Sequence, residues 1–142
     1  MTDLRHIVFL ACVPLFLPVP VFAACGSTNQ ASMPAQVVDA QFAAYNAHDL
    51  NSFASCYADD VTMIDLSGKR PVIKGNIELR KAFSYLANPP NGRGVQIVRR
   101  IVNGPMVIDQ ERPVGMTGKP DLIAIYEVRN GKIINVWFPP AM

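Results

Sequence analysis

A single aspartate at the end of an apolar stretch is well suited by its position to acid–base chemistry. Asp65 closes the run Val61-Thr62-Met63-Ile64-Asp65. Residues two apart in a β-strand face the same way, so a fold that buries Val61 and Met63 brings Asp65 to the rim of the same interior. A buried acid is satisfied by a donor or a cation, or it has a raised pKa and carries protons. The alternative is a turn or a cap, because Asp is common at such positions.

Two further carboxylates and an arginine fall on two other predicted strands. Asp109 and Glu111 alternate with apolar residues, and a two-residue turn at Asn103-Gly104 places Arg100 diagonally across from Asp109. One interpretation is a solvated outer face with a surface ion pair. The other is that these carboxylates point into the concave face of the sheet, where repulsion between them and Asp65 raises at least one pKa.

A second hairpin offers aromatic rings and an amide. Asn130-Gly131 predicts a two-residue turn, which leaves one nearly aliphatic face and one mixed face. The mixed face comprises Ala124, Tyr126, Val128, Ile133, Asn135 and Trp137. Amphipathic rings and an amide suit a pocket wall that meets both an apolar ligand and water. The alternative is an ordinary half-exposed sheet face.

The elements that must position these side chains follow from the apolar periodicity. Helices are expected at 34–47, after the cap residue Asp49, and from Asn76 to about Leu86. Strands are expected from Asp59 to Asp65, at 72–73, 95–102, 106–114, 122–129 and 132–138. Helices followed by antiparallel strands indicate an α+β fold, with the helices packed on one side of a curved sheet.

The first 24 residues are predicted to be a signal peptide. Arg5 and His6 precede an apolar run broken by prolines, and Val21-Phe22-Ala23 fits a small-residue cleavage rule. A polar linker at 25–33 leads to the domain at 34–140. Cleavage near Ala23 and lipid attachment to Cys25 are the two alternatives. Both predict export, to the periplasm or the medium.

Composition excludes several classes of function. The 142 residues fit a single domain, and a net charge of +2 with scattered basic residues argues against a nucleic-acid partner. His48 is the only histidine after the predicted signal peptide, so neither a zinc site nor a histidine-based triad is expected, and no metal or cofactor is predicted. Cys56 is either a buried thiol or the disulfide partner of Cys25.

Four segments together resemble the nuclear transport factor 2-like (NTF2-like) superfamily, in its SnoaL-like and ketosteroid isomerase-like branch. They are the run Val37-Val38 to Leu50, the run Cys56 to Val61, the helix that follows Gly75, and the run Ile125 to Ile133. The resemblance spans residues 34–138. It implies a cone, in which a curved antiparallel sheet wraps around a long helix and encloses a deep apolar pocket, and a homodimer formed through the sheet.

The resemblance also implies site residues. Asp65 matches the proton-transfer base of ketosteroid isomerase, whereas Gln41 and Ala124 stand where that enzyme has its oxyanion-binding tyrosine and protonated aspartate. Tyr45 or Tyr126 is the expected substitute donor. The predicted catalytic residues are Asp65, Asp109 and Tyr126, and the predicted substrate-binding residues are Tyr45, Gln41, Met63, Arg100, Glu111, Asn135 and Trp137.

The resulting expectation is an exported protein whose pocket takes a small hydrophobic molecule. If it is an enzyme, the expected chemistry is cofactor-independent proton transfer, as in an isomerase or a polyketide cyclase, and epoxide hydrolysis by an Asp–Arg–Asp relay is less favoured. The alternatives are a non-catalytic ligand-binding module and a dimeric interaction module, because fold does not determine function.

Overall fold

The computed structural model describes residues 25, 33–88 and 92–140. The predicted signal peptide and most of the predicted linker therefore lie outside the described residues. In the part of the chain that is described, no helix is long and apolar enough to cross a membrane.

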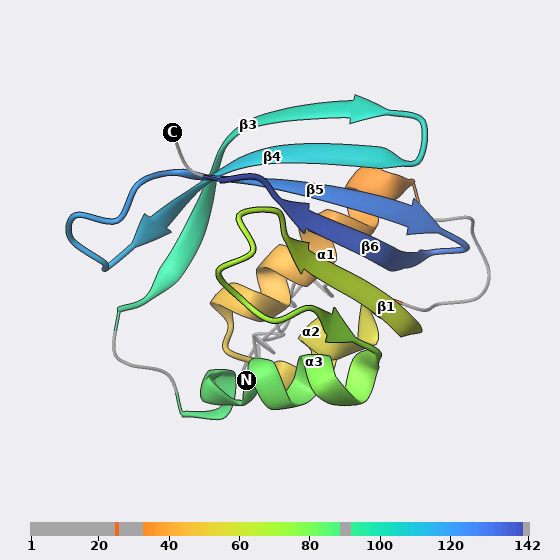
Figure 1. The fold of residues 1–142 in the computed structure, drawn as a ribbon, viewed down its shortest axis with the longest axis horizontal. Coiled ribbons are helices and arrows are strands. Elements are labelled where there is room, and N and C mark those ends of the chain that lie inside the picture. Colours follow the sequence, from red (N-terminus) through yellow and green to blue (C-terminus); the bar gives the residue numbers. More distant parts are fainter. Residues whose placement is uncertain (1–24, 26–32, 89–91, 141–142) are drawn as a thin grey trace, which may run out of the picture.

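Helices and strands form two layers, with the helices on one side of a curved, open sheet (Figure 1). The helices are α1 (Pro34–Asn46), α2 (Leu50–Ser55), α3 (Asn76–Ala82) and a short 3-10 helix, η1 (Ser84–Ala87). The strands are β1 (Tyr57–Asp65), β2 (Ile73–Lys74), β3 (Gly94–Asn103), β4 (Met106–Val114), β5 (Leu122–Arg129) and β6 (Lys132–Phe138). They pair in the order β2-β1-β6-β5-β4-β3, and all neighbours are antiparallel except β1 and β6. The predicted α+β cone is confirmed.

Local sequence signals explain where the first helices begin. Pro34 occupies the first turn of α1, where its missing N–H breaks no helical hydrogen bond. Asp49 caps α2, because its Oδ1 accepts from Ser52 N at 3.0 Å and its Oδ2 accepts from Ser52 Oγ at 2.6 Å. Both starts match the predicted positions.

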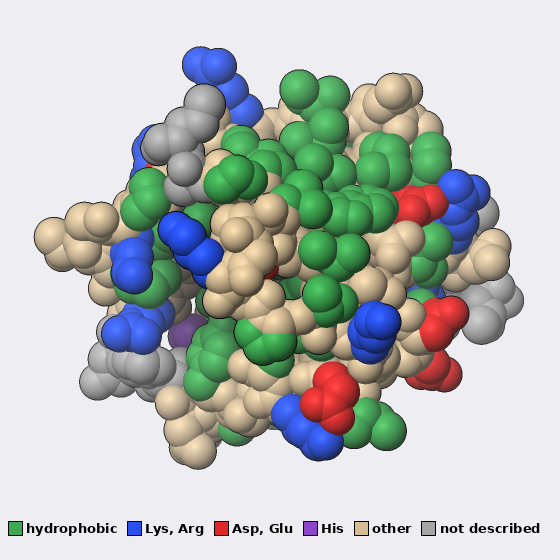
Figure 2. Space-filling model, in the orientation of Figure 1, with side chains coloured by type: hydrophobic (Ala, Val, Ile, Leu, Met, Phe, Trp, Pro, Cys, Tyr) green, Lys and Arg blue, Asp and Glu red, His purple; other side chains and the backbone are tan. Residues whose placement is uncertain are grey.

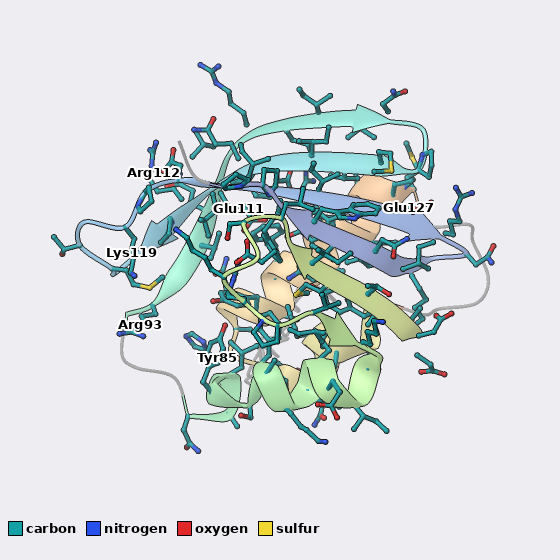
Figure 3. All side chains as sticks on the ribbon, in the orientation of Figure 1. Tyr85, Arg93, Glu111, Arg112, Lys119 and Glu127 are labelled. Carbon is teal, nitrogen blue, oxygen red and sulfur yellow. A yellow bond between two sulfur atoms is a disulfide. The ribbon has the colours of Figure 1, made fainter. Side chains whose placement is uncertain are left out.

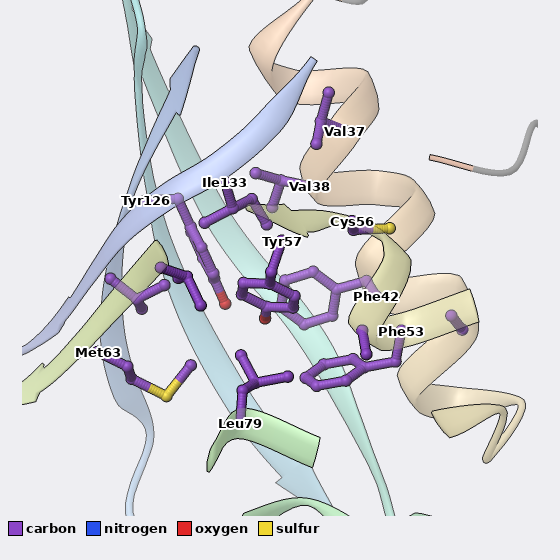
Figure 4. Packing of buried hydrophobic residues seen from close by; sticks show 14 of the residues in the cluster. Val37, Val38, Phe42, Phe53, Cys56, Tyr57, Met63, Leu79, Tyr126 and Ile133 are labelled. Carbon is purple, nitrogen blue, oxygen red and sulfur yellow. The ribbon is translucent and has the colours of Figure 1, made fainter. Parts of the chain in front are cut away.

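The hydrophobic core lies between the helices and the concave face of the sheet. Aromatic rings from α1, α2, β1 and β5 meet there, among them Phe42, Phe53, Tyr57 and Tyr126 (Figure 4). The ring of Phe53 lies 5.0 Å from that of Tyr57 and 4.8 Å from that of Phe83, measured between centroids. The helical stripes predicted from the sequence thus supply the inner wall of the cone.

The turn between β3 and β4 is shifted by one residue from its predicted position. Asn103 pairs with Met106, so the two turn residues are Gly104 and Pro105. In the predicted register Pro105 would pair with Val102 next to the turn. Proline has no N–H to donate to the hydrogen bonds between the strands, so this register is disfavoured. This shift sets Arg100 directly opposite Asp109 instead of diagonally. An irregularity between Ile97 and Arg99 changes the register again farther from the turn.

The turn between β5 and β6 has the predicted position, but a bulge changes the faces beyond it. Arg129 pairs with Lys132 and both Asn130 and Gly131 have positive φ, as the predicted turn type requires. Ile134 is then an extra residue, because Val128 pairs with Ile133 whereas Glu127 pairs with Asn135. Beyond Ile134, each side chain of β6 therefore lies on the opposite face of the sheet from the one predicted. A regular two-residue alternation could not predict this.

Two predicted pocket residues consequently lie on the outer face of the sheet. Asn135 donates from Nδ2 to Glu127 Oε2 at 2.9 Å, and Trp137 pairs with Ile125. Val136, which lies between them in β6, is fully buried on the inner face instead. The assignment of Asn135 and Trp137 to the inner face was therefore wrong.

A disulfide joins Cys25 to Cys56, at the junction between α2 and β1. Lys132 lies beside it, and its Nζ donates to the carbonyl oxygens of Cys25 and Ser55. Of the two alternatives for Cys56, the structure has the disulfide.

Candidate functional site

A cavity of about 160 Å³ lies between the helices and the inner face of the sheet. Its walls are mainly aromatic and aliphatic, and its polar groups are few, as is typical of small-molecule sites. The lining residues are Gln41, Phe42, Tyr45, Phe53, Tyr57, Met63, Arg70, Phe83, Tyr85, Val95, Glu111, Pro113, Met116, Leu122, Tyr126 and Phe138.

Glu111 is a buried carboxyl group in the cavity wall. It lies on β4 and is only 7% exposed, and its Oε1 accepts a hydrogen bond of 2.6 Å from the hydroxyl of Tyr126 on β5. Burial raises the pKa of Glu111 to about 7; the Tyr126 hydrogen bond opposes this rise, and the charge of Asp109 adds to it. Glu111 can therefore gain and lose a proton near neutral pH.

Other polar groups surround the same space. Gln41 on α1 is 4% exposed, and its Oε1 has no hydrogen-bond partner among the described residues. Tyr57 is 3% exposed, and burial raises the pKa of its hydroxyl well above the usual range. Leaving a buried acceptor unpaired costs ~1–3 kcal/mol, so the Gln41 oxygen favours a ligand that brings a donor.

Two tyrosines form the exposed side of the cavity. The hydroxyls of Tyr45 and Tyr85 lie 3.2 Å apart, and Tyr85 is 45% exposed. Burial of the phenol, followed by the hydrogen bond to Tyr45, raises the pKa of Tyr85. Tyr85 therefore stays neutral and can donate a hydrogen bond at physiological pH.

Asp109 is fully buried but belongs to an ion-pair network that does not line the cavity. Arg100 donates from Nε to Asp109 Oδ1 at 2.7 Å and from Nη2 to Oδ2 at 2.8 Å. Its Nη1 donates to Asp39 Oδ1 on α1. The hydrogen bond to Asp109 is the main reason that the pKa of Arg100 is raised, so this arginine stays charged. Arg100 therefore links β3 to β4 through Asp109 and to α1 through Asp39, behind Glu111.

Asp65 is held in a turn. Its Oδ1 accepts from Ser67 N at 2.9 Å and from Ser67 Oγ at 2.6 Å, and its Oδ2 pairs with Arg70 Nε at 2.9 Å. The hydrogen bond from Ser67, then that from Arg70, lowers the pKa of Asp65 to about 2. This is the turn arrangement that the sequence left open as the alternative, and it keeps the carboxylate ionised.

The structure brings together only part of the predicted site. Gln41, Tyr45, Met63, Glu111 and Tyr126 line the cavity. The other predicted residues are absent from its lining: Asp65, Arg100, Asp109, Asn135 and Trp137. Within the described residues, no three His, Cys, Asp or Glu side chains are grouped as metal ligands.

Several lining residues were not assigned to a site from the sequence. Phe42, Phe53 and Phe83 belong to the predicted apolar stripes, so the stripes themselves were the signal for them. Arg70 and Met116 come from connecting segments, for which no periodicity exists. Their contribution depends on how those connections fold over the end of the sheet.

Solved structures of low sequence identity share this architecture. An NTF-2 like protein of unknown function from Burkholderia xenovorans is 22% identical, with a TM-score of 0.63 over 77% of this chain and 84% of its own. A protein with a ketosteroid isomerase-like fold from Catenulispora acidiphila is 16% identical, with a TM-score of 0.61 over 78% and 88%. An LEH-like epoxide hydrolase of M. tuberculosis is 18% identical, with a TM-score of 0.57 over 75% and 80%.

No curated protein matches this chain. The model of the SnoaL-like domain matches residues 38–136, which is more than half of the 142 residues. That segment runs from α1 to β6 and contains nearly every residue of the cavity wall. The chain therefore belongs to the SnoaL-like domain family, in the NTF2-like superfamily.

Proposed function

We propose that the cavity binds a small, largely apolar carbonyl compound and that Glu111 transfers a proton on it without a cofactor. The observation that carries the proposal is a buried carboxyl group with a pKa of about 7 in an aromatic cavity. A general base works best when its pKa lies near the working pH. Isomerisation and cyclisation are the reaction classes that need such a base.

In this proposal the ionised Glu111 removes a proton from the carbon next to the carbonyl and returns it at another position. Tyr126 orients the carboxyl group by donating to Oε1. The developing enolate oxygen needs a donor, which is worth ~3–4 kcal/mol in measured cases. Tyr57 and Gln41 are the buried polar side chains of the cavity that remain available for it.

The test is hydrogen exchange. Purified protein is incubated in D₂O with a panel of cyclic and aryl ketones, and deuterium uptake next to the carbonyl is followed by NMR. The wild type should catalyse uptake, with a rate that is half-maximal near pH 7 and levels off above it as Glu111 becomes fully ionised. Glu111→Gln should lose at least about a hundredfold, the lower range for a general base.

Glu127→Gln is the matched control, because it makes the same substitution at a carboxylate outside the cavity lining. It should exchange at the wild-type rate. Loss of exchange in Asp65→Asn but not in Glu111→Gln would return the role of base to Asp65. No exchange by the wild type with any ketone would overturn the catalytic proposal.

A non-catalytic ligand-binding module is the second candidate. It is favoured by the observation that two of the three predicted acids, Asp65 and Asp109, are occupied by ion pairs and do not line the cavity. In that case ketones or alcohols bind, Glu111→Gln changes their affinity, and no variant catalyses exchange.

We further propose that the protein is exported and forms a homodimer. The Cys25–Cys56 disulfide supports export, since such bonds persist mainly in oxidising compartments. Self-association is supported by the uncovered outer face of the sheet, where Ile101 is 63% exposed and Ile123 is 39% exposed. Figure 2 shows hydrophobic side chains gathered over this part of the sheet.

A further inference from the structure

We infer that the ligand of this cavity carries a carboxylate, and that Arg70 binds that carboxylate at the mouth. The inference rests on the proposed function, because it describes the ligand of the same cavity. It names a class: small acids with an apolar body.

Arg70 lies in the cavity wall with most of its donors unused. Its Nε donates to Asp65, and among the described residues neither of its terminal nitrogens has a hydrogen-bond partner. A guanidinium group has five N–H donors in a fixed fork, so one used edge leaves another that can bind a carboxylate. The Arg70 side chain is 60% exposed, which places this edge where a ligand enters.

The guanidinium group is held in position from two sides. Its carbon lies 5.1 Å from the ring centroid of Phe138, which also lines the cavity, and the Asp65 carboxylate holds its Nε at 2.9 Å. Asp65 is itself fixed by Ser67. An arginine with both its face and one edge fixed loses less conformational freedom when it binds an anion. In this inference Asp65, the acid predicted at the end of the strand, positions Arg70.

The charges around the mouth also favour an anion. Arg93, Arg112 and Lys119 lie at the end of the molecule where the β4–β5 connection projects, on the same side as Tyr85 (Figure 3). Arg112 is neutralised by Asp121, but neither Arg93 nor Lys119 has an ion-pair partner among the described residues. Two uncompensated cations beside an apolar cavity attract anionic ligands and raise their local concentration.

The apolar body of the ligand would lie between the two polar ends. Asp65, which holds Arg70, pairs with Phe138 and lies two residues from Met63 on the same face of β1. Arg70 is therefore close to the side chains of Met63 and Phe138. Glu111, Tyr126 and Gln41 form the buried polar end. An acid that carries a carbonyl or a hydroxyl group at its far end matches both ends.

The experiment compares acids with their neutral amides. Phenylacetate and phenylacetamide, and hexanoate and hexanamide, are titrated into the purified protein at low salt by calorimetry. Wild type should prefer each acid over its amide. Arg70→Gln should weaken the acids about tenfold, the worth of one charge-assisted hydrogen bond, and leave the amides within about twofold. Arg70→Lys, which keeps the charge, should fall between.

Arg129→Gln is a closely matched control. Arg129 is 59% exposed and pairs through Nε with Glu127, as Arg70 is 60% exposed and pairs through Nε with Asp65. Glu127 lies at the end of the molecule opposite to Arg93 and Lys119 (Figure 3). This variant should bind every probe as the wild type does.

The outcomes separate the two proposals. If amides bind as tightly as acids, or if Arg70→Gln weakens both alike, the carboxylate inference is overturned and the proposed cavity function stands. If neither acids nor amides bind, the proposed function fails and the inference fails with it. An equal loss of acid binding in Arg129→Gln would show general attraction rather than a site at Arg70, and would also overturn the inference.

Discussion

Folding favours the neutral form of Glu111 over the ionised form, because it removes the carboxyl group from water. Its pKa is about 7 in the fold, against 4.5 without the surroundings of the fold. Between these two values the folded chain keeps a proton that the unfolded chain releases. Raising the pH from about 4.5 to about 7 therefore favours unfolding.

This linkage gives a testable pH dependence of stability. The Glu111 contribution should fall by about 3 kcal/mol between pH 4.5 and pH 7 and stay constant above it. Glu111→Gln should remove most of this slope. The measurement is the free energy of unfolding in urea at pH 5, 6, 7 and 8. Equal slopes in the wild type and the variant would contradict the buried, neutral state of Glu111.

Asp65 provides the internal comparison for this experiment. Its pKa is lowered to about 2, so its contribution to stability is present above pH 4 and is lost only as the pH falls toward 2. Asp65→Asn should therefore leave the slope between pH 5 and pH 8 unchanged. A changed slope would mean that Asp65 titrates in that range.

Residue types alone predicted the candidates but not their assignment. The sequence correctly grouped Asp109, Glu111 and Arg100 on adjacent strands, and the pairing of Arg100 with Asp109 is confirmed. The one-residue shift of the β3–β4 turn sets Arg100 directly opposite Asp109, where the predicted register had the two residues diagonal to each other. Asp109 therefore has an ion-pair partner, whereas Glu111 has none among the described residues.

At the scale of elements, the Cys25–Cys56 disulfide attaches the chain before α1 to the end of α2. It closes a loop with a sequence separation of 31 residues. Disulfides of this loop length stabilise by about 3–4 kcal/mol, mainly by restricting the unfolded chain. Cys56→Ser should lower the free energy of unfolding by about this amount.

The control is reduction. Dithiothreitol should destabilise the wild type as much as the substitution does, and it should not affect Cys56→Ser. Unfolding curves that do not change when the wild type is reduced would show that the bond is absent or without consequence.

The same bond bears on the lipid alternative. A sulfur that is joined to Cys56 cannot also carry a thioether-linked lipid, so we expect an exported chain without a lipid on Cys25. Intact-mass analysis of protein purified from its source checks this. A mass increased by a diacylglyceryl group, together with a free Cys56 thiol, would contradict it.

Elements could be predicted where a period persists and not where it is interrupted. Helix α1, the cap at Asp49 and the Asn130-Gly131 turn follow from local preferences, and each lies where the sequence predicted it. The interruptions at Val98 and Ile134 leave no local signal, because β-branched residues suit both strands and bulges between strands.

For the whole molecule, the proposed homodimer is directly testable. A partner on the outer face of the sheet would cover Ile101 and Ile123, so Ile101→Arg should shift the protein from dimer to monomer in sedimentation velocity experiments. Ile77→Arg is the control, since Ile77 is 72% exposed on α3, in the layer that covers the other face. A wild type that is monomeric at high concentration would contradict the proposal.

The bulge at Ile134 has a consequence for how such cavities can diversify. If β6 kept the register of the Arg129–Lys132 pair without the bulge, Asn135 rather than Val136 would lie opposite Tyr126, Trp137 would turn toward the interior and Phe138 would leave the wall. The cavity would then change size and polarity while every helix and strand stayed in place. Its contents thus depend on the register of β6 as much as on the identity of its residues, and the gain or loss of a bulge there is a direct way to exchange one ligand class for another.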